Sequence, residues 1–388
     1  MKWGVVAGLV LVAIGLVALP HLRPVLYSAP VAESSPVATA IQPPVVTHVA
    51  TPLAVKGIYM TACVAGSPKW RAELERMITT TELNSIVIDI KDYTGTISFI
   101  APTLEEGSAG GCHVSDMQNF IMELHKQGVY VIGRVTVFQD PHYARVHPEL
   151  AIKSKSNGGT WKDYKGLPFI DVGARPYWDH VVAIAKAGYA LGFDEINFDY
   201  VRYPSDGNLK DMNTTWTVGS STKAQMVQDF FVYLHDQLRN TGMKTSADLF
   251  GLTTLAEDDM GIGQVLTNAL PYFDYIDPMV YPSHFASGAD GFAKPAEHPY
   301  DIIKWSMSSG LAREQALDIK MGIATSTPSK LRPWIQDFDL GAVYNAPEVR
   351  AQMQATYDTG LTSWLSWDAG NHYTPGAYTL RSVVSRNE

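Results

Sequence analysis

The segment EINFDYVRYP, residues 195–204, decides the fold assignment. In an extended strand successive side chains point to opposite faces, so Glu195, Asn197 and Asp199 share one face. Phe198 and Tyr200 share the other face, which suits packing against helices. As one strand of a parallel barrel, the segment would bury its aromatic residues outside and point Asp199 into the barrel mouth.

The same kind of unit recurs along the chain: a β-rich run, a polar loop and an amphipathic helix. Helices are predicted at 116–127, 176–190 and 222–239 from their caps and apolar spacing. The predicted strands are 56–61, 85–91, 129–137, 195–203, 244–250, 275–281, 319–324 and 362–367. Eight βα units predict a single (β/α)8 TIM barrel over residues 53–388. A doubly wound sheet would more often show five or six units and a Gly-rich loop after its first strand.

The amino-acid composition limits the classes of function that the chain can have. The 388 residues are 46% apolar and 18% charged, so the chain can bury a large core. Thirty Lys and Arg face 39 Asp and Glu, giving a net charge of -9 without any basic block. We therefore expect no nucleic-acid partner.

The first 52 residues predict a location outside the cytoplasm. Residues 1–23 carry an almost unbroken apolar run, which predicts a transmembrane anchor or a signal peptide. Residues 24–52 are rich in Pro, Ala, Ser and Thr and predict a flexible linker. The barrel would be tethered to the cell membrane, or secreted if the segment is cleaved. In that setting Cys63 and Cys112 can form a disulfide.

Two carboxylates suggest glycoside cleavage. Asp199 and Asp248 lie near the ends of predicted strands four and five, and neighbouring strands are about 4.8 Å apart. Glycosidases use such a pair, one ionised to attack or stabilise the sugar cation and one protonated to release the leaving oxygen. Asp199 suits the ionised role because Arg134 and Arg202 would favour its charge. Asp248 has apolar neighbours and suits the acid role, and Asp89 on strand two is a third catalytic candidate.

Other polar and aromatic residues near strand ends are candidates for binding sugar rings, to which aromatic side chains offer flat apolar faces. The predicted substrate-binding residues are Asp92, Arg134, Arg202, Tyr281, His284, Trp334, Asp337, Trp364 and Trp367. Glu195 lies at the other end of its strand, where barrel residues serve stability.

Several motifs resemble a known family. They are VKGIYMT (55–61), SIVIDIKDYTG (85–95), HPELAIKSKSNGGTWKDYKGLPFIDV (147–172), LGFDEINFDYVRYP (191–204), SADLFG (246–251), YIDPMVYPSHF (275–285) and RPWIQDF (332–338). Together they resemble the putative glycosyl hydrolase domain family, barrels distantly related to α-amylase-type enzymes. The resemblance spans residues 55 to 370 and implies an exported (β/α)8 hydrolase acting on carbohydrate, with Asp199 as the leading catalytic residue.

The α-amylase-type pattern itself is not complete. It would place an Arg two residues before the strand-four Asp, a Glu on strand five and an Asp after strand seven. This chain has Asn197, Asp248 and no acid in MGIATSTPS (321–329), which contains the end of the predicted seventh strand. The acid could then be Asp89 or Asp92 instead.

Two other readings stay open. A barrel that binds glycan without cleaving it would share these features. A metal-dependent polysaccharide deacetylase would need two His and an Asp to converge, but His142 and His147 are five residues apart on a predicted loop. We predict no metal site and no cofactor, and no P-loop occurs.

Overall fold

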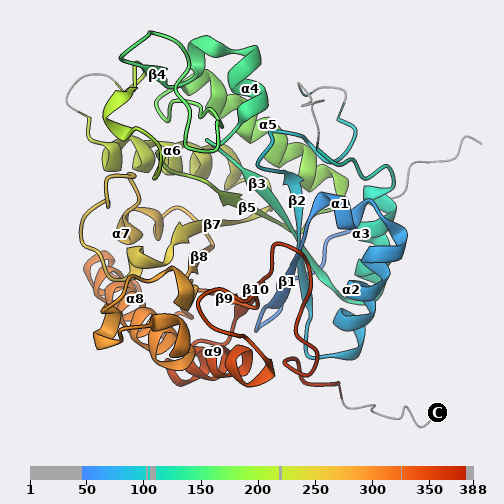
Figure 1. Cartoon of the computed structure of the whole chain (residues 1–388). Coiled ribbons are helices and arrows are strands. Elements are labelled where there is room, and N and C mark those ends of the chain that lie inside the picture. Colours follow the sequence, from blue (N-terminus) through green and yellow to red (C-terminus); the bar gives the residue numbers. More distant parts are fainter. Residues whose placement is uncertain (1–45, 102–103, 105–110, 218–220, 325, 382–388) are drawn as a thin grey trace, which may run out of the picture. The chain divides into compact units, whose positions relative to one another are not determined.

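The computed structural model describes residues 46–101, 104, 111–217, 221–324 and 326–381. Eight parallel strands close into a barrel, and helices pack around its outside (Figure 1). The barrel strands follow the chain order around the ring, and the last one pairs with the first. They are β1 (Lys56–Met60), β2 (Ser85–Lys91), β3 (Tyr130–Thr136), β5 (Glu195–Asp199), β7 (Lys244–Phe250), β8 (Tyr275–Met279), β9 (Trp334–Gln336) and β10 (Trp364–Trp367). This is the predicted (β/α)8 architecture.

The helices begin and end at residues that favour those positions. The Thr222 hydroxyl caps the helix at 223–238, and Gly192, at φ 126°, ends the helix at 175–191. The helices are α1 (Ala62–Ala65), α2 (Pro68–Thr80), α3 (Met117–Lys126), α4 (Pro141–Val146), α5 (Arg175–Leu191), α6 (Lys223–Leu238), α7 (Leu266–Ala269), α8 (Pro299–Met321) and α9 (Ala346–Asp358). The three helices predicted from the sequence are α3, α5 and α6.

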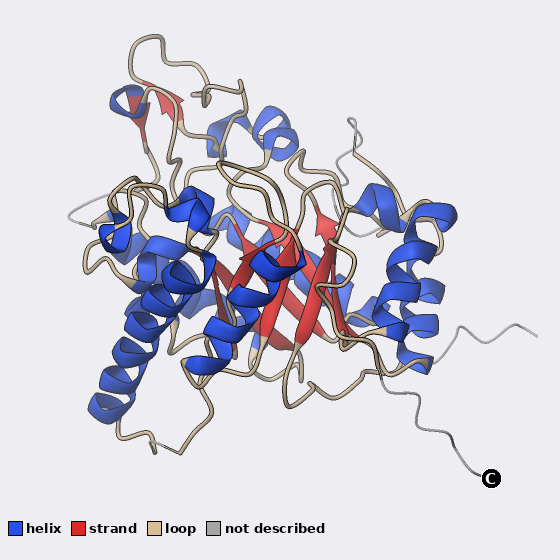
Figure 2. Ribbon diagram, turned by 60° about the horizontal axis from the view of Figure 1, so that its bottom comes forward, coloured by secondary structure: helices blue, strands red, loops and turns tan. Residues whose placement is uncertain are grey.

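Short elements extend the loops that follow the strands. The 3-10 turns are Pro148–Leu150, Leu209–Asp211, Gly251–Thr254, Pro282–His284, Ala289–Gly291 and Pro295–Glu297. Strands β4 (Lys153–Ser154) and β6 (Met212–Asn213) form a separate antiparallel pair, apart from the barrel strands in Figure 2. Its small core contains Trp161 and Phe169, and Tyr200 packs against that core. The loops after β3 and β5 are therefore joined above the barrel mouth.

The predicted seventh strand is wrong. Residues 319–324 contain the end of α8, which stops at Gly322 with φ 74°. The seventh strand is β9, three residues long, which pairs with β10 and β8. A segment this short, directly after Pro333, carries too little alternation to be recognised as a strand.

The predicted anchor at 1–23 and the first part of the predicted linker lie outside the described residues. Residues 46–52, also assigned to the linker, contact the amino-terminal end of the barrel. There the Val49 N–H donates to Asp194 at 2.7 Å, and the His48 ring stacks on Tyr189 at 4.0 Å. None of the helices in the described part of the chain is long and apolar enough to cross a membrane.

Candidate active site

A cavity of about 410 Å³ opens at the carboxyl ends of the strands. Its walls combine two arginines and two aspartates with a larger set of aromatic and aliphatic groups. The lining residues are Arg134, Asp199, Tyr200, Arg202, Asp248, Phe250, Gly251, Leu252, Met279, Tyr281, His284, Phe285 and Trp367. The cavity lies where active sites of this architecture are found.

Asp199 is the last residue of β5, and three N–H groups hold its carboxylate. Arg134 donates to Oδ2 from Nη2 at 2.5 Å and from Nε at 3.1 Å, and the Tyr200 backbone N–H donates to Oδ1 at 2.6 Å. Tyr200 has φ 53°, a left-handed conformation that is uncommon for residues other than glycine. Backbone strain of this kind concentrates at functional sites. All three hydrogen bonds to the Asp199 carboxylate in the described residues come from N–H donors.

Arg134 holds two further carboxylates on β2 and β7. Its Nη1 donates to Asp89 at 2.7 Å, and its Nε lies 3.9 Å from Asp248 Oδ2. Asp89 also accepts the Tyr59 hydroxyl at 2.5 Å, and burial raises the pKa of Asp89 although Arg134 and Tyr59 oppose the rise. Asp89 does not line the cavity, so its contacts make it a residue that positions Arg134.

Asp248 stands level with Asp199, because Phe198 pairs with Ala247 in the sheet register. Its Oδ1 accepts the Trp334 indole N–H at 2.7 Å and the Asn197 amide at 2.9 Å. Burial raises the pKa of Asp248 well above its ordinary value, and the nearby negative charge of Asp199 raises it further. Both cavity carboxylates are buried, but Asp199 accepts two N–H groups of the Arg134 cation, whereas Asp248 accepts the neutral donors of Trp334 and Asn197.

Below the cavity the barrel interior contains a cluster of buried charged groups. Arg332 donates to Glu195 and to Asp277, with Nη2 distances of 2.5 and 2.8 Å. All three side chains are fully buried. Burial raises the pKa of Asp277 to about 6, against the opposing effect of Arg332. Asn197 connects this layer to the site, since its amide group lies 3.2 Å from Asp277 and 2.9 Å from Asp248.

The structure brings seven of the twelve predicted site residues to the cavity. They are Asp199, Asp248, Arg134, Arg202, Tyr281, His284 and Trp367. The predicted contact between Arg202 and Asp199 is not an ion pair, because among the described residues no Asp or Glu oxygen lies within 4.0 Å of an Arg202 nitrogen. The Arg202 guanidinium instead donates to the Tyr203 carbonyl at 3.0 Å.

The other five predicted site residues do not line the cavity. Asp89 contacts Arg134, as described above. Trp334 is fully buried inside the barrel against Asp248, and Trp364 points outward, where its indole N–H donates to Tyr357 at 2.8 Å. Asp92 closes a turn by accepting the Thr94 backbone N–H at 2.8 Å.

Asp337 is the fifth of these residues. Because the seventh strand is β9 and not 319–324, Asp337 directly follows it, in the place where the α-amylase-type pattern has an Asp. Its carboxylate accepts the Tyr378 hydroxyl at 2.7 Å and the Thr374 N–H at 3.1 Å. These contacts tie the chain after β10 to β9, away from the cavity.

Sequence reasoning missed several lining residues. Tyr200 follows Asp199 directly, Phe250 is the last residue of β7, and Gly251 and Leu252 follow it. Their position at or just after the end of a barrel strand was the available signal. Tyr59 was also missed, although its ring stacks on Trp367 at 4.1 Å beside the site.

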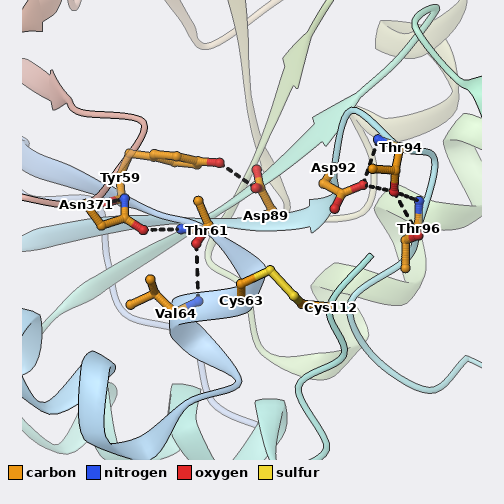
Figure 3. The surroundings of a disulfide bond; sticks show 10 residues. All are labelled: Tyr59, Thr61, Cys63, Val64, Asp89, Asp92, Thr94, Thr96, Cys112 and Asn371. Atoms are coloured by element: carbon orange, nitrogen blue, oxygen red, sulfur yellow. Dashed lines mark hydrogen bonds between the residues drawn. A yellow bond between two sulfur atoms is a disulfide. The ribbon is translucent and has the colours of Figure 1, made fainter. Parts of the chain in front are cut away.

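A disulfide joins Cys63 in α1 to Cys112, on the segment that precedes α3. Figure 3 shows this bond with Thr61 and Val64 next to Cys63. The Thr61 hydroxyl accepts the Val64 N–H and caps α1. The disulfide thus fixes the loop after β2 to the first turn after β1.

No three His, Cys, Asp or Glu side chains in the described part of the chain are grouped so as to hold a metal ion. His142 lies in α4, whose carboxyl end is capped by His147. The cluster considered for a deacetylase is therefore not assembled.

Three solved structures illustrate what the chain resembles. The PgaB (BpsB) glycoside hydrolase domain from Bordetella bronchiseptica is 13% identical, with 85% of this chain and 100% of that chain covered and a TM-score of 0.61. Alpha-L-fucosidase isoenzyme 2 from Paenibacillus thiaminolyticus is 12% identical, covers 81% of this chain and 46% of its own, and has a TM-score of 0.54. These two likenesses show the fold. A hypothetical protein from Ruminiclostridium thermocellum ATCC 27405 is 32% identical over 49% of this chain and 96% of its own, with a TM-score of 0.45.

No curated protein matches the chain. A family model described as "Putative glycosyl hydrolase domain" matches residues 57–373, which include every residue that lines the cavity. The chain belongs to this family of glycoside hydrolases.

Proposed function

We propose that this chain is an exported glycoside hydrolase that cleaves a polysaccharide with Asp199 and Asp248 as its carboxylate pair. One observation carries the proposal: Arg134 Nε lies 3.1 Å from Asp199 and 3.9 Å from Asp248, in a cavity at the barrel mouth. The sum of these two distances is the largest possible separation between the Oδ2 atoms of Asp199 and Asp248. That bound is well below the ~9.5 Å upper end of the range known for glycosidase pairs.

Asp199 takes the ionised role. Its Oδ2 is fixed by two N–H groups of Arg134, so the carboxylate is oriented before a sugar arrives. A fixed negative charge beside the anomeric carbon stabilises the positive charge that develops there as the glycosidic bond breaks. Preorganisation of this kind costs no rearrangement during the reaction.

Asp248 takes the acid role. Burial raises the pKa of Asp248, which keeps it protonated at a pH where a free aspartic acid is ionised. Trp334 and Asn197 occupy Oδ1, so the proton belongs on Oδ2, the oxygen that lies toward Arg134. This proton passes to the leaving oxygen, and water supplies the hydroxyl at the anomeric carbon and returns a proton to Asp248.

The cavity walls suit a carbohydrate. Trp367, Tyr281 and Phe250 provide aromatic surface on which sugar rings can stack. The Tyr59 ring stacks behind Trp367 with an interplanar angle of 17° and thereby holds it in place. Such a wall binds the apolar face of a sugar and leaves its hydroxyls to polar groups.

The proposal that the chain is exported rests on two features. The apolar run at residues 1–23 is typical of an anchor or a signal peptide. The Cys63–Cys112 disulfide is of a kind that persists in oxidising compartments and is rare in the cytosol. We therefore place the barrel outside the cytoplasm, attached to the cell membrane or secreted.

The test is reducing-end release by the purified chain from a panel of polysaccharides and aryl glycosides. Glycan binding is measured on the same panel. Release of reducing ends by the wild-type chain supports hydrolysis. Binding to glycans without release from any of them would identify a carbohydrate-binding barrel and contradict the proposal.

A further inference from the structure

The cavity contains a second buried arginine, Arg202, whose charge has no carboxylate partner in the described structure. Its side chain is only 7% exposed, yet it lines the cavity. The other buried arginines are paired differently: Arg134 contacts Asp89 and Asp199, and Arg332 contacts Glu195 and Asp277. Within the described residues, a Tyr203 carbonyl is the hydrogen-bond acceptor of Arg202, at 3.0 Å from Nη1.

The guanidinium of Arg202 is also fixed in orientation. It lies over the Tyr200 ring at 4.9 Å and over the Phe250 ring at 4.6 Å, and both residues line the cavity. Aromatic contacts hold the plane of the group without using its N–H donors. The N–H groups of the Arg202 guanidinium that do not donate to the Tyr203 carbonyl remain available to bind a ligand.

The surroundings of Arg202 do not neutralise it. The cavity acids, Asp199 and Asp248, lie 3.1 and 3.9 Å from Arg134 Nε. Tyr200, Asp199, Asp206 and Asp163 act on Arg202 only through space, and burial lowers the pKa of Arg202 despite them. Burying a cation without a partner is unfavourable, so an anion that enters the cavity gains more from Arg202 than it would at the surface.

We infer that Arg202 is a specificity residue for an acidic glycan, and that the sugar in this cavity carries an oxyanion, the carboxylate of a uronic acid or a sulfate ester. The inference rests on the proposed function and names its substrate class. A planar guanidinium presents paired N–H donors that match the two oxygens of a carboxylate, and it also binds sulfate oxygens.

The test compares acidic glycans with neutral counterparts of the same backbone. Polygalacturonate is paired with its carboxyl-reduced polymer, and a sulfated galactan with its desulfated form. Binding is measured for the wild-type chain, Arg202→Gln and Arg202→Lys. Arg239→Gln serves as the control, because it removes a surface arginine whose side chain is 57% exposed.

The wild-type chain should bind at least one acidic polymer on the order of 10-fold more tightly than its neutral counterpart. Arg202→Gln should lose this preference, Arg202→Lys should retain part of it, and the control should keep it. The pair of polymers that shows the preference identifies the anion as carboxylate or sulfate. Urea unfolding of each variant checks that it is folded.

Two results would overturn the inference. One is equal or absent binding of acidic and neutral polymers by the wild-type chain, and the other is an unchanged preference in folded Arg202→Gln. Hydrolysis of neutral glycans alone would overturn the acidic substrate and leave the proposed hydrolase intact. Selective binding of acidic polymers without any reducing-end release would support the acidic ligand and contradict the proposed hydrolase.

Discussion

The indole N–H of Trp334 donates to Oδ1 of Asp248 at 2.7 Å, inside the barrel and below the cavity floor. This contact gives Trp334 a role different from the sugar stacking that its sequence position suggested. It orients a carboxyl group in the cavity and leaves Oδ2 to carry the proton. The seventh strand therefore contributes to the site by positioning Asp248.

Replacement of Trp334 by Phe should move the basic limb of the activity profile to higher pH. The donor that is lost favours the ionised form of Asp248, so its removal raises the pKa of Asp248 further. The measurement is kcat/KM against pH. Trp364→Phe is a matched control, because Trp364 is equally buried and donates to Tyr357. A basic limb that stays in place in Trp334→Phe, or moves equally in both variants, would contradict this role.

Replacement of Asp248 by Asn should make the rate depend on the leaving group. Without an acid, glycosides with poor leaving groups should lose on the order of 10²- to 10⁴-fold in kcat/KM. Aryl glycosides with acidic phenols should lose much less kcat/KM, because their phenolate leaves without being protonated. Wild-type activity should also fall as pH rises through the raised pKa of Asp248, and this basic limb should be absent in the variant.

The control for this series is Asp92→Asn, whose carboxylate closes a turn with Thr94 and does not line the cavity. Rates of the control should match the wild-type chain for every leaving group. Equal losses on all glycosides in Asp248→Asn would mean that Asp248 is not the acid.

Replacement of Arg332 by Met should destabilise the fold. The change leaves Glu195 and Asp277 without their shared cation in the barrel interior. Loss of one member of a buried ion pair costs about 3–5 kcal/mol. The free energy of unfolding in urea measures the loss. Arg239→Met, which removes an exposed pairing with Asp236 at 3.8 Å, should change it by less than about 1 kcal/mol.

The disulfide should stabilise the folded chain. Cys63 and Cys112 are 49 residues apart, and the chain-entropy model assigns a cross-link of this span about 4 kcal/mol. The double variant Cys63→Ala/Cys112→Ala should lose this much unfolding free energy. A reducing agent should lower the stability of the wild-type chain to the same value and leave the variant unchanged. Insensitivity of the wild-type chain to reduction would contradict the prediction.

Much of this architecture could be predicted from local pattern. The alternation in residues 195–199 is confirmed, with Glu195, Asn197 and Asp199 inside the barrel and Phe198 in the outer core. The ends of α5 and α6 follow from Gly192 and Thr222. These features depend on residues close to each other in the chain, where periodicity and capping rules apply.

The partners of buried groups could not be predicted in this way. Glu195 and Arg332 are 137 residues apart, and only the closed barrel brings them together. Arg202 was expected beside Asp199 because they are near in sequence, but the left-handed turn at Tyr200 follows the end of the strand. Trp334 was not recognised as part of the seventh strand, because that strand was predicted at 319–324 and the three residues of β9 show no clear alternation.

The most direct test of the central claim is turnover by Asp199→Asn, measured together with glycan binding and unfolding free energy. Asp92→Asn serves again as the control. The account predicts that kcat falls on the order of 10⁴-fold or more while glycan affinity stays within a few-fold of the wild-type value and the chain remains folded. A folded Asp199→Asn variant that still cleaves glycan at near the wild-type rate would contradict it.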